Sequence, residues 1–194
     1  MTSLSGNLKN RNHNGGYSLM ELVVVISIMV IAVGIAGLSV SVMFAKDAER
    51  WAKAIDDQLS EVRMAAMSKP GVYILKLNTV STGEGNTIEI KRTSDPTLPA
   101  TFAVADETRQ IKVKERAYIM IGEEGAVPAD PADGTYGTIE IWFNKANGSV
   151  SQISINGTPA DLTKAYEIKC IAVRNKSKEK SIKIMPVTGR HFIE

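Results

Sequence analysis

The residue types best suited to catalysis are scarce in this chain of 194 residues. It has two histidines, His13 and His191, and one cysteine, Cys170. The sequence has no HExxH motif, CxxC pair, glycine-rich phosphate loop or serine-centred elbow, so a catalytic triad or a metal-hydrolase site would depend on His191 alone. Cys170 alternates with apolar residues, which favours a buried strand position over a reactive thiol. We therefore predict a protein that is not an enzyme, with no catalytic residue, no metal site and no cofactor.

An acidic segment at residues 122–137 could supply oxygen ligands for calcium. Glu123, Glu124, Asp130 and Asp133 are hard donors of the kind that Ca²⁺ prefers, but their spacing does not match the calcium loop of an EF-hand. Two prolines in the same segment indicate an exposed loop. We favour a solvated acidic loop over a calcium site.

Basic residues concentrate near the end of the chain, where they could contact the phosphates of DNA. No aromatic residue is interleaved with the lysines to stack on bases. Alternating lysines on an outer strand can instead protect an exposed sheet edge. We favour the edge and keep DNA contact as the alternative, with Arg174, Lys176, Lys178, Lys180, Lys183 and Arg190 as its candidate residues.

The most informative feature of the sequence is an uncharged apolar run from Leu22 to Ala45. This run exceeds the ~20 residues that a helix needs to cross a bilayer, and it predicts a transmembrane helix. The residues before it include Lys9 and Arg11, and residues 1–16 contain no acidic residue, so the positive-inside rule places the N-terminus in the cytoplasm. The prediction is a single-pass inner-membrane protein whose remainder lies outside the cytoplasm.

The small pair Gly15-Gly16 precedes the apolar run, whereas a secretory signal has its small-residue cleavage site after the run. The segment from Gly16 to Glu21, GYSLME, followed by LVVVISIMVIAVGIA, resembles the processing site of type IV prepilins and pseudopilins. That resemblance implies cleavage after Gly16 by a prepilin peptidase and N-methyltransferase, and an N-methylated Tyr17 at the new terminus. The implied partners are other pilin or pseudopilin subunits, an inner-membrane assembly platform, and membrane lipid before assembly into an extracytoplasmic filament.

Glu21 is a carboxylate at the edge of the apolar run, where a charge is costly and is functional by default. The resemblance makes it the acidic residue at the fifth mature position. Four residues along a rigid helix, the geometry favours a pair with the α-amino group of a neighbouring subunit's Tyr17 over its own. Such a pair would set the axial register of a filament. The alternative is an interfacial glutamate that faces lipid headgroups.

The remainder of the chain predicts a helix followed by strands. Residues 46–69 are mostly helix formers with an apolar stripe, and Pro70-Gly71 ends the pattern. We expect an α+β pilin fold, in which one long N-terminal helix, half transmembrane and half amphipathic, packs on an antiparallel β-sheet domain. The stripe consists of Trp51, Ile55, Leu59, Val62 and Ala66, and the expected strands are 72–77, 87–91, 111–121, 138–143, 150–155, 166–173 and 181–187.

Within the pilin family, the chain most resembles the minor pseudopilin branch known as GspH/FimT. The positions that carry this finer resemblance are Leu59, Arg63, Ala66, Phe143, Gly148, Gly189 and Arg190. A single cysteine excludes the intrachain disulfide that closes many major pilins, which also favours a minor subunit.

The predicted organisation has four parts: a cleaved leader at 1–16, a transmembrane and filament-core helix at 17–45, an amphipathic continuation at 46–69, and a β-rich periplasmic or extracellular domain at 70–194. The predicted function is a structural subunit of a type IV pilus, a type II secretion pseudopilus or a competence filament. The alternatives are a DNA-binding minor pilin for DNA uptake and a plain single-pass membrane protein.

Overall fold

The computed structural model describes residues 18–94 and 107–194, except for the side chains of residues 35–45. The chain divides into two compact units, Met1–Val40 and Ser41–Glu194. The predicted cleavage residues Gly16 and Tyr17 lie outside the described residues, so their processing stays a prediction.

The first described element is helix α1, which spans Leu19–Ser68. Ser18 caps its start, because the Ser18 hydroxyl accepts a hydrogen bond from the backbone N–H of Glu21 at 3.2 Å. At the other end, Pro70 cannot continue a helix, and Gly71 adopts a positive φ of 107°. The predicted end of the helix at Pro70-Gly71 is confirmed.

The structure contradicts the predicted transmembrane half of this helix. Among the helices of the described residues, none combines the length and the apolarity that crossing a membrane demands. The prediction rested on the absence of charged residues from Leu22 to Ala45.

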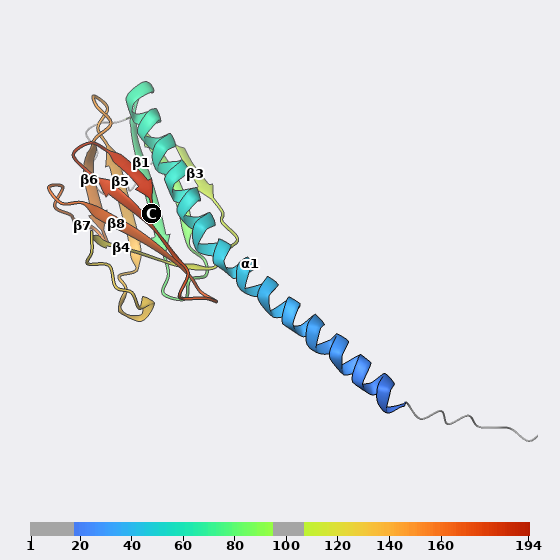
Figure 1. The fold of residues 1–194 in the computed structure, drawn as a ribbon. Helices are drawn as coiled ribbons and strands as arrows, with labels where there is room; N and C mark the ends of the chain where they lie inside the picture. Colours follow the sequence, from blue (N-terminus) through green and yellow to red (C-terminus); the bar gives the residue numbers. More distant parts are fainter. Residues whose placement is uncertain (1–17, 95–106) are drawn as a thin grey trace, which may run out of the picture. The chain divides into compact units, whose positions relative to one another are not determined.

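Ten strands in the described part of the chain form two antiparallel sheets (Figure 1). A short 3₁₀ helix, η1 (Pro131–Asp133), lies between the fourth and fifth strands. The strands are β1 (Val72–Thr79), β2 (Thr87–Thr93), β3 (Glu107–Ile111), β4 (Ala117–Glu123), β5 (Gly137–Phe143), β6 (Val150–Ile155), β7 (Thr158–Pro159), β8 (Tyr166–Ala172), β9 (Glu179–Met185) and β10 (Arg190–Ile193).

The larger sheet has the order β3-β2-β1-β5-β6-β7, and the smaller has the order β10-β9-β8-β4. Strands β5 and β6 form a hairpin around Asn147-Gly148, in which they pair antiparallel with Ile141 opposite Ile153. Its turn is closed by a hydrogen bond from the Gly148 N–H to the Asn144 carbonyl at 2.9 Å.

The core of the Ser41–Glu194 unit is formed by one face of α1 and one face of each sheet. In Figure 1 the second half of α1 runs alongside the strands. Burial of large apolar side chains at this junction supplies the main driving force for folding. The predicted apolar stripe of α1 is confirmed, since Trp51, Ile55, Leu59, Val62 and Ala66 are all buried.

The predicted fold class is wrong in two respects. No membrane-spanning helix is found in the described residues, and the helix of the Ser41–Glu194 unit contributes to a mostly β structure with two sheets in place of one sheet domain. Alternation along a strand shows which residues share a face, but it does not show which strand is the neighbour. The sequence pattern therefore could not separate β4, β8, β9 and β10 from the larger sheet.

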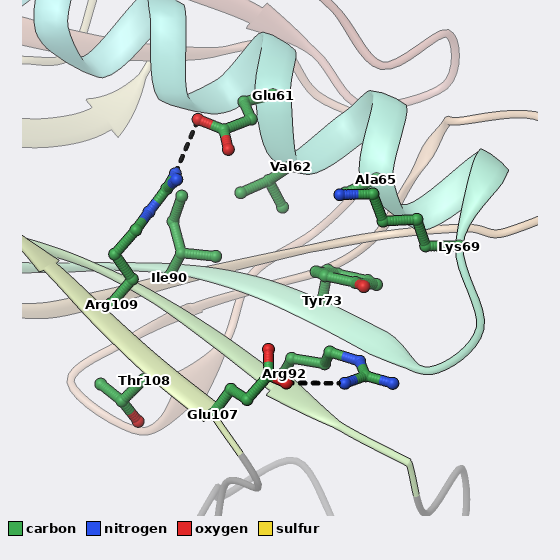
Figure 2. Close-up of a pocket in the computed structure, with 10 residues that line it drawn as sticks. All are labelled: Glu61, Val62, Ala65, Lys69, Tyr73, Ile90, Arg92, Glu107, Thr108 and Arg109. Atoms are coloured by element: carbon green, nitrogen blue, oxygen red, sulfur yellow. Dashed lines mark hydrogen bonds and ion pairs between the residues drawn. The ribbon is translucent and has the colours of Figure 1, made fainter.

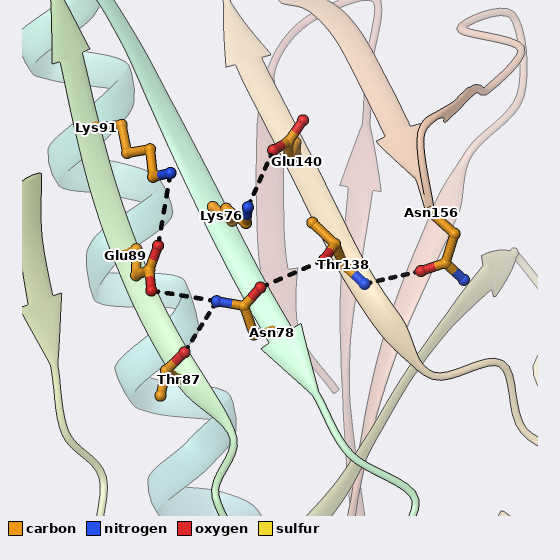
Figure 3. A network of polar contacts seen from close by, with 8 residues as sticks. All are labelled: Lys76, Asn78, Thr87, Glu89, Lys91, Thr138, Glu140 and Asn156. Atoms are coloured by element: carbon orange, nitrogen blue, oxygen red, sulfur yellow. Dashed lines mark hydrogen bonds and ion pairs between the residues drawn. The ribbon is translucent and has the colours of Figure 1, made fainter. Parts of the chain in front are cut away.

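The opposite face of the larger sheet carries a polar network (Figure 3). Lys76 and Asn78 alternate along β1 with the core residues Leu75 and Leu77. The Asn78 amide donates to Thr87 Oγ1 at 3.0 Å and to Glu89 Oε1 at 3.3 Å, and its oxygen accepts from Thr138 Oγ1 at 3.3 Å. These bonds connect the neighbouring strands β2, β1 and β5, which gives the polar residues of this face a structural role.

Candidate functional site

Glu21, the residue predicted to set filament register, lies in the first turn of α1 and is exposed. Ser18 and Glu21 have the S-x-x-E spacing of a capping box, in which the acidic side chain can return to the backbone of the cap. The structure contains the first half of that arrangement, the bond from the Glu21 N–H to Ser18 Oγ. A carboxylate at this position also interacts favourably with the positive end of the helix dipole. Glu21 therefore has a local role in addition to the predicted one.

On both sides of Glu21 in the sequence, the apolar side chains of α1 are exposed through Val33. Val33 is 72% exposed, Leu19 is 82% exposed, and no polar face replaces the apolar one over this stretch. An apolar surface of this extent marks a site of interaction with another molecule or another copy. The large apolar residues concerned are Leu19, Met20, Leu22, Val23, Val24, Val25, Ile26, Ile28, Met29, Val30, Ile31 and Val33.

The acidic segment and the basic end of the chain, considered separately in the sequence, contact each other. Lys183 Nζ lies 2.9 Å from Glu124 Oε1 and 2.9 Å from Glu194 Oε2. Lys176 Nζ lies 3.5 Å from Asp130 Oδ1. The hydrogen bonds that Lys183 donates to Glu124 and Glu194 raise the pKa of Lys183. The hydrogen bond that Asp130 accepts from the Ala132 N–H, followed by the charge of Lys176, lowers the pKa of Asp130.

These contacts also affect the calcium alternative. Glu123 Oε1 lies 2.6 Å from Lys164 Nζ, so three of the four candidate carboxylates are already paired with lysines. Within residues 18–94 and 107–194 no group of three or more metal-ligating side chains is arranged to hold an ion. The acidic loop is explained by its lysine partners.

The six residues predicted to contact DNA do not share one face. Lys180 and Lys183 differ by an odd number of positions on β9, so their side chains leave opposite faces of the sheet. Lys176 and Lys178 are exposed in the connection before that strand, and Arg190 begins β10. Arg174 follows β8. DNA contact stays a prediction. The fold places its six candidate residues on different segments and faces, and not on one surface.

A groove lies between α1 and strands β2 and β3 (Figure 2). Its volume is about 310 Å³, and its apolar lining consists of Val62, Ala65, Tyr73 and Ile90. Two ion pairs lie at its rim: Arg109 with Glu61 at 2.6 Å, and Arg92 with Glu107 at 3.0 Å. In both pairs the arginine has a carboxylate partner within the rim.

Ser60, His191 and Asp56 come together between α1 and β10. Ser60 Oγ lies 2.9 Å from His191 Nε2, and Asp56 Oδ1 lies 3.8 Å from the same nitrogen. The His191 side chain is only 6% exposed. Burial raises the pKa of Asp56, and the charge of His191 offsets this only in part. Neither partner of His191 could be predicted from the sequence, because no local pattern links Ser60 to a residue 131 positions away.

This cluster does not have the geometry of a catalytic triad. In a triad the carboxylate binds Nδ1 of the histidine, while the serine binds Nε2. Here both Ser60 and Asp56 approach Nε2, and Nδ1 lies 3.3 Å from the carbonyl of Gly189. A carbonyl only accepts hydrogen bonds, so Nδ1 donates to the Gly189 carbonyl, while Nε2 faces the hydroxyl of Ser60. The cluster holds β10 against the helix.

Three of the positions that resemble the minor pseudopilin branch meet in one junction. Arg63 Nε donates to the Gly148 carbonyl at 2.9 Å, and its Nη2 donates to the Thr188 carbonyl at 3.1 Å. Gly148 and Gly189 have φ values of 67° and 66°, in the region that favours glycine. Arg63 thereby connects α1 with the turn before β6 and the turn before β10.

Cys170 is fully buried in β8, and burial raises its pKa to about 12. The expected buried strand position is confirmed.

Comparisons with protein-family models, with curated proteins and with solved structures found no match for this chain.

Proposed function

We propose that this protein is a structural subunit of a type IV filament, as a minor pilin or pseudopilin, and that it assembles through its N-terminal helix. The observation that carries the proposal is the continuous exposed apolar surface of residues 19–33. Apolar surface of this extent is unfavourable in water, and identical helices packed in a filament would remove it from solvent. The proposal requires a pilus, a secretion pseudopilus or a competence filament in which copies of this helix are neighbours.

Glu21 adds a directional element to this packing. Once cleavage after Gly16 exposes the α-amino group of Tyr17, the carboxylate of Glu21 in one subunit can pair with that group in the next. A charge pair among apolar helices favours one axial register, because a shifted register leaves both charges buried without a partner. The required partners are the prepilin peptidase, sister subunits and the assembly platform.

The test separates the charge of Glu21 from its capping role. The observed cap bond uses the backbone N–H of residue 21, which glutamine also has, so Glu21→Gln removes the charge and keeps the cap. Ser18→Ala does the reverse, and it should weaken the start of the helix by about 1 kcal/mol. We expect Glu21→Gln to abolish incorporation into filaments, measured in sheared filament fractions, and Ser18→Ala to retain most of it.

Both variants must first be shown to lose the leader, by intact-mass analysis with and without the prepilin peptidase. A mature wild-type chain that begins at N-methylated Tyr17 is expected. If Glu21→Gln enters filaments as efficiently as wild type, the charge pair is not the basis of assembly. If residues 1–16 stay attached in the native host, the filament proposal itself fails.

A further inference from the structure

A basic cavity lies in the Ser41–Glu194 unit, where α1 meets the β3–β4 connection and the segment that follows β8. Its volume is about 360 Å³, and five basic and two acidic side chains line it. Lys46 and Arg50 are four residues apart on α1 and so share one face of the helix. Lys114, Arg116 and Arg174 complete the basic lining.

Internal contacts hold the wall of this cavity in place. The indole N–H of Trp51, a buried side chain, donates to the carbonyl of Glu115 at 2.8 Å. The Glu115 carboxylate lies 2.5 Å from Arg50 Nη1, and Arg116 Nη1 lies 2.8 Å from Glu84 Oε1. The β3–β4 connection is therefore fixed against the helix before any ligand binds, which limits the ordering cost of binding.

The lysines of the cavity are not neutralised within the protein. Lys46 and Lys114 are exposed, and neither has an ion-pair partner in the parts of the chain that the structure describes. Five basic side chains face two acidic lining residues and Glu84 beyond them, so positive charge is in excess. Such a concave basic site suits a phosphate group, for which lysine and arginine donate charge-assisted hydrogen bonds.

We infer that this cavity binds the phosphate of an anionic phospholipid headgroup. The position of Lys46 in the sequence supports this source of phosphate, because Lys46 is the first charged residue after the uncharged run 22–45. Basic clusters directly beside an apolar helical segment are attracted to anionic lipid surfaces. The inference does not rest on filament assembly, since an unassembled subunit would bind lipid in the same way.

Two other phosphate sources are distinguishable. Inorganic phosphate would occupy the cavity without any membrane, and a DNA duplex would engage basic residues without requiring an anionic bilayer. The concave shape and the adjoining apolar sequence favour the headgroup over the duplex. DNA binding is therefore an outcome of the test and not part of the proposal.

The experiment uses the full chain, with vesicles of phosphatidylglycerol or of phosphatidylcholine in a flotation assay at low salt. The site variant is Lys46→Gln/Lys114→Gln. The matched control is Lys69→Gln/Lys145→Gln, because these lysines are also exposed and have no ion-pair partner among the described residues. Lys69 lies about 34 Å along the helix axis from Lys46, at 1.5 Å per residue.

We expect the site variant to lose affinity for phosphatidylglycerol vesicles by about fivefold per lysine, or roughly 25-fold for the pair, and the control to stay near wild type. Binding to phosphatidylcholine should be unchanged in both. An equal loss in the two variants, or no loss in the site variant, would overturn the proposal. The proposal would also be overturned if wild type showed no preference for phosphatidylglycerol vesicles and instead bound inorganic phosphate or a short DNA duplex through Lys46 and Lys114.

Discussion

Gly189 should be among the least replaceable residues of the chain, because its Cα faces another backbone. It has a φ of 66°, and a Cβ built on it would overlap the carbonyl oxygen of Gly148. The same Cβ would lie 3.1 Å from Arg63 Nε. The turn before β10 can therefore accept an alanine at this position only if it moves away from the β5–β6 turn.

The magnitude follows from two separate costs. Alanine in the left-handed region costs about 1–2 kcal/mol. Separation of the two turns would remove the hydrogen bond from Arg63 Nε to the Gly148 carbonyl, and a bond to a charged group is worth about 1.5–3 kcal/mol. We expect Gly189→Ala to lower the free energy of unfolding by about 3–5 kcal/mol in total.

Gly157 provides a matched control in the same unit. Its φ is 81°, but nothing lies within 4 Å of the Cβ that alanine would add. Gly157→Ala should therefore show only the conformational cost, about 1–2 kcal/mol. Urea unfolding followed by tryptophan fluorescence suits the comparison, because Trp51 and Trp142 are both buried in the Ser41–Glu194 unit. Equal destabilisation by the two alanines would refute the argument from the close approach of the two turns.

Two further predictions concern titratable groups whose pKa is raised by full or partial burial. Cys170 is the chain's one cysteine, and burial raises its pKa to about 12. Iodoacetamide should therefore leave the native protein unmodified and alkylate it rapidly in denaturant, which mass spectrometry can measure. Rapid alkylation of the native protein would contradict the buried position. The raised pKa of Asp56 means that the folded state retains its proton to higher pH than the unfolded chain, so this residue lowers stability as pH rises above its ordinary value of 3.8. Asp56→Asn should therefore gain stability relative to wild type as pH rises from about 4 towards neutrality, and parallel pH profiles of urea unfolding would exclude this.

Local patterns were sufficient to predict many elements of the fold. The alternation in residues 150–155 predicts a strand with the same bounds as β6, and Pro70-Gly71 correctly marks the end of α1. Both signals depend on neighbouring residues only, since side-chain alternation and the chemistry of proline act over a few positions.

Predictions failed where the outcome depends on distant partners. The expected strand 111–121 is interrupted, since β3 ends at Ile111 and β4 begins at Ala117 in the other sheet. The connection between them contains Glu115, whose carbonyl is held by Trp51 from α1. The pattern of residues 111–121 gives no sign of this bond, and so it could not show that the chain leaves one sheet for the other.

The same limitation explains the two alternatives that the sequence left open, a calcium loop and a DNA-binding hairpin. Each was inferred from an apparent excess of one charge, but Lys183 lies between Glu124 and Glu194, and Lys176 pairs with Asp130. A phosphate or a calcium ion would have to compete with these intramolecular partners. The cavity at Lys46 and Lys114 differs in this respect, because these two lysines are exposed and unpaired among the described residues. Local charge in the sequence is thus a weaker guide to binding than the charge that remains after the fold has paired its own residues.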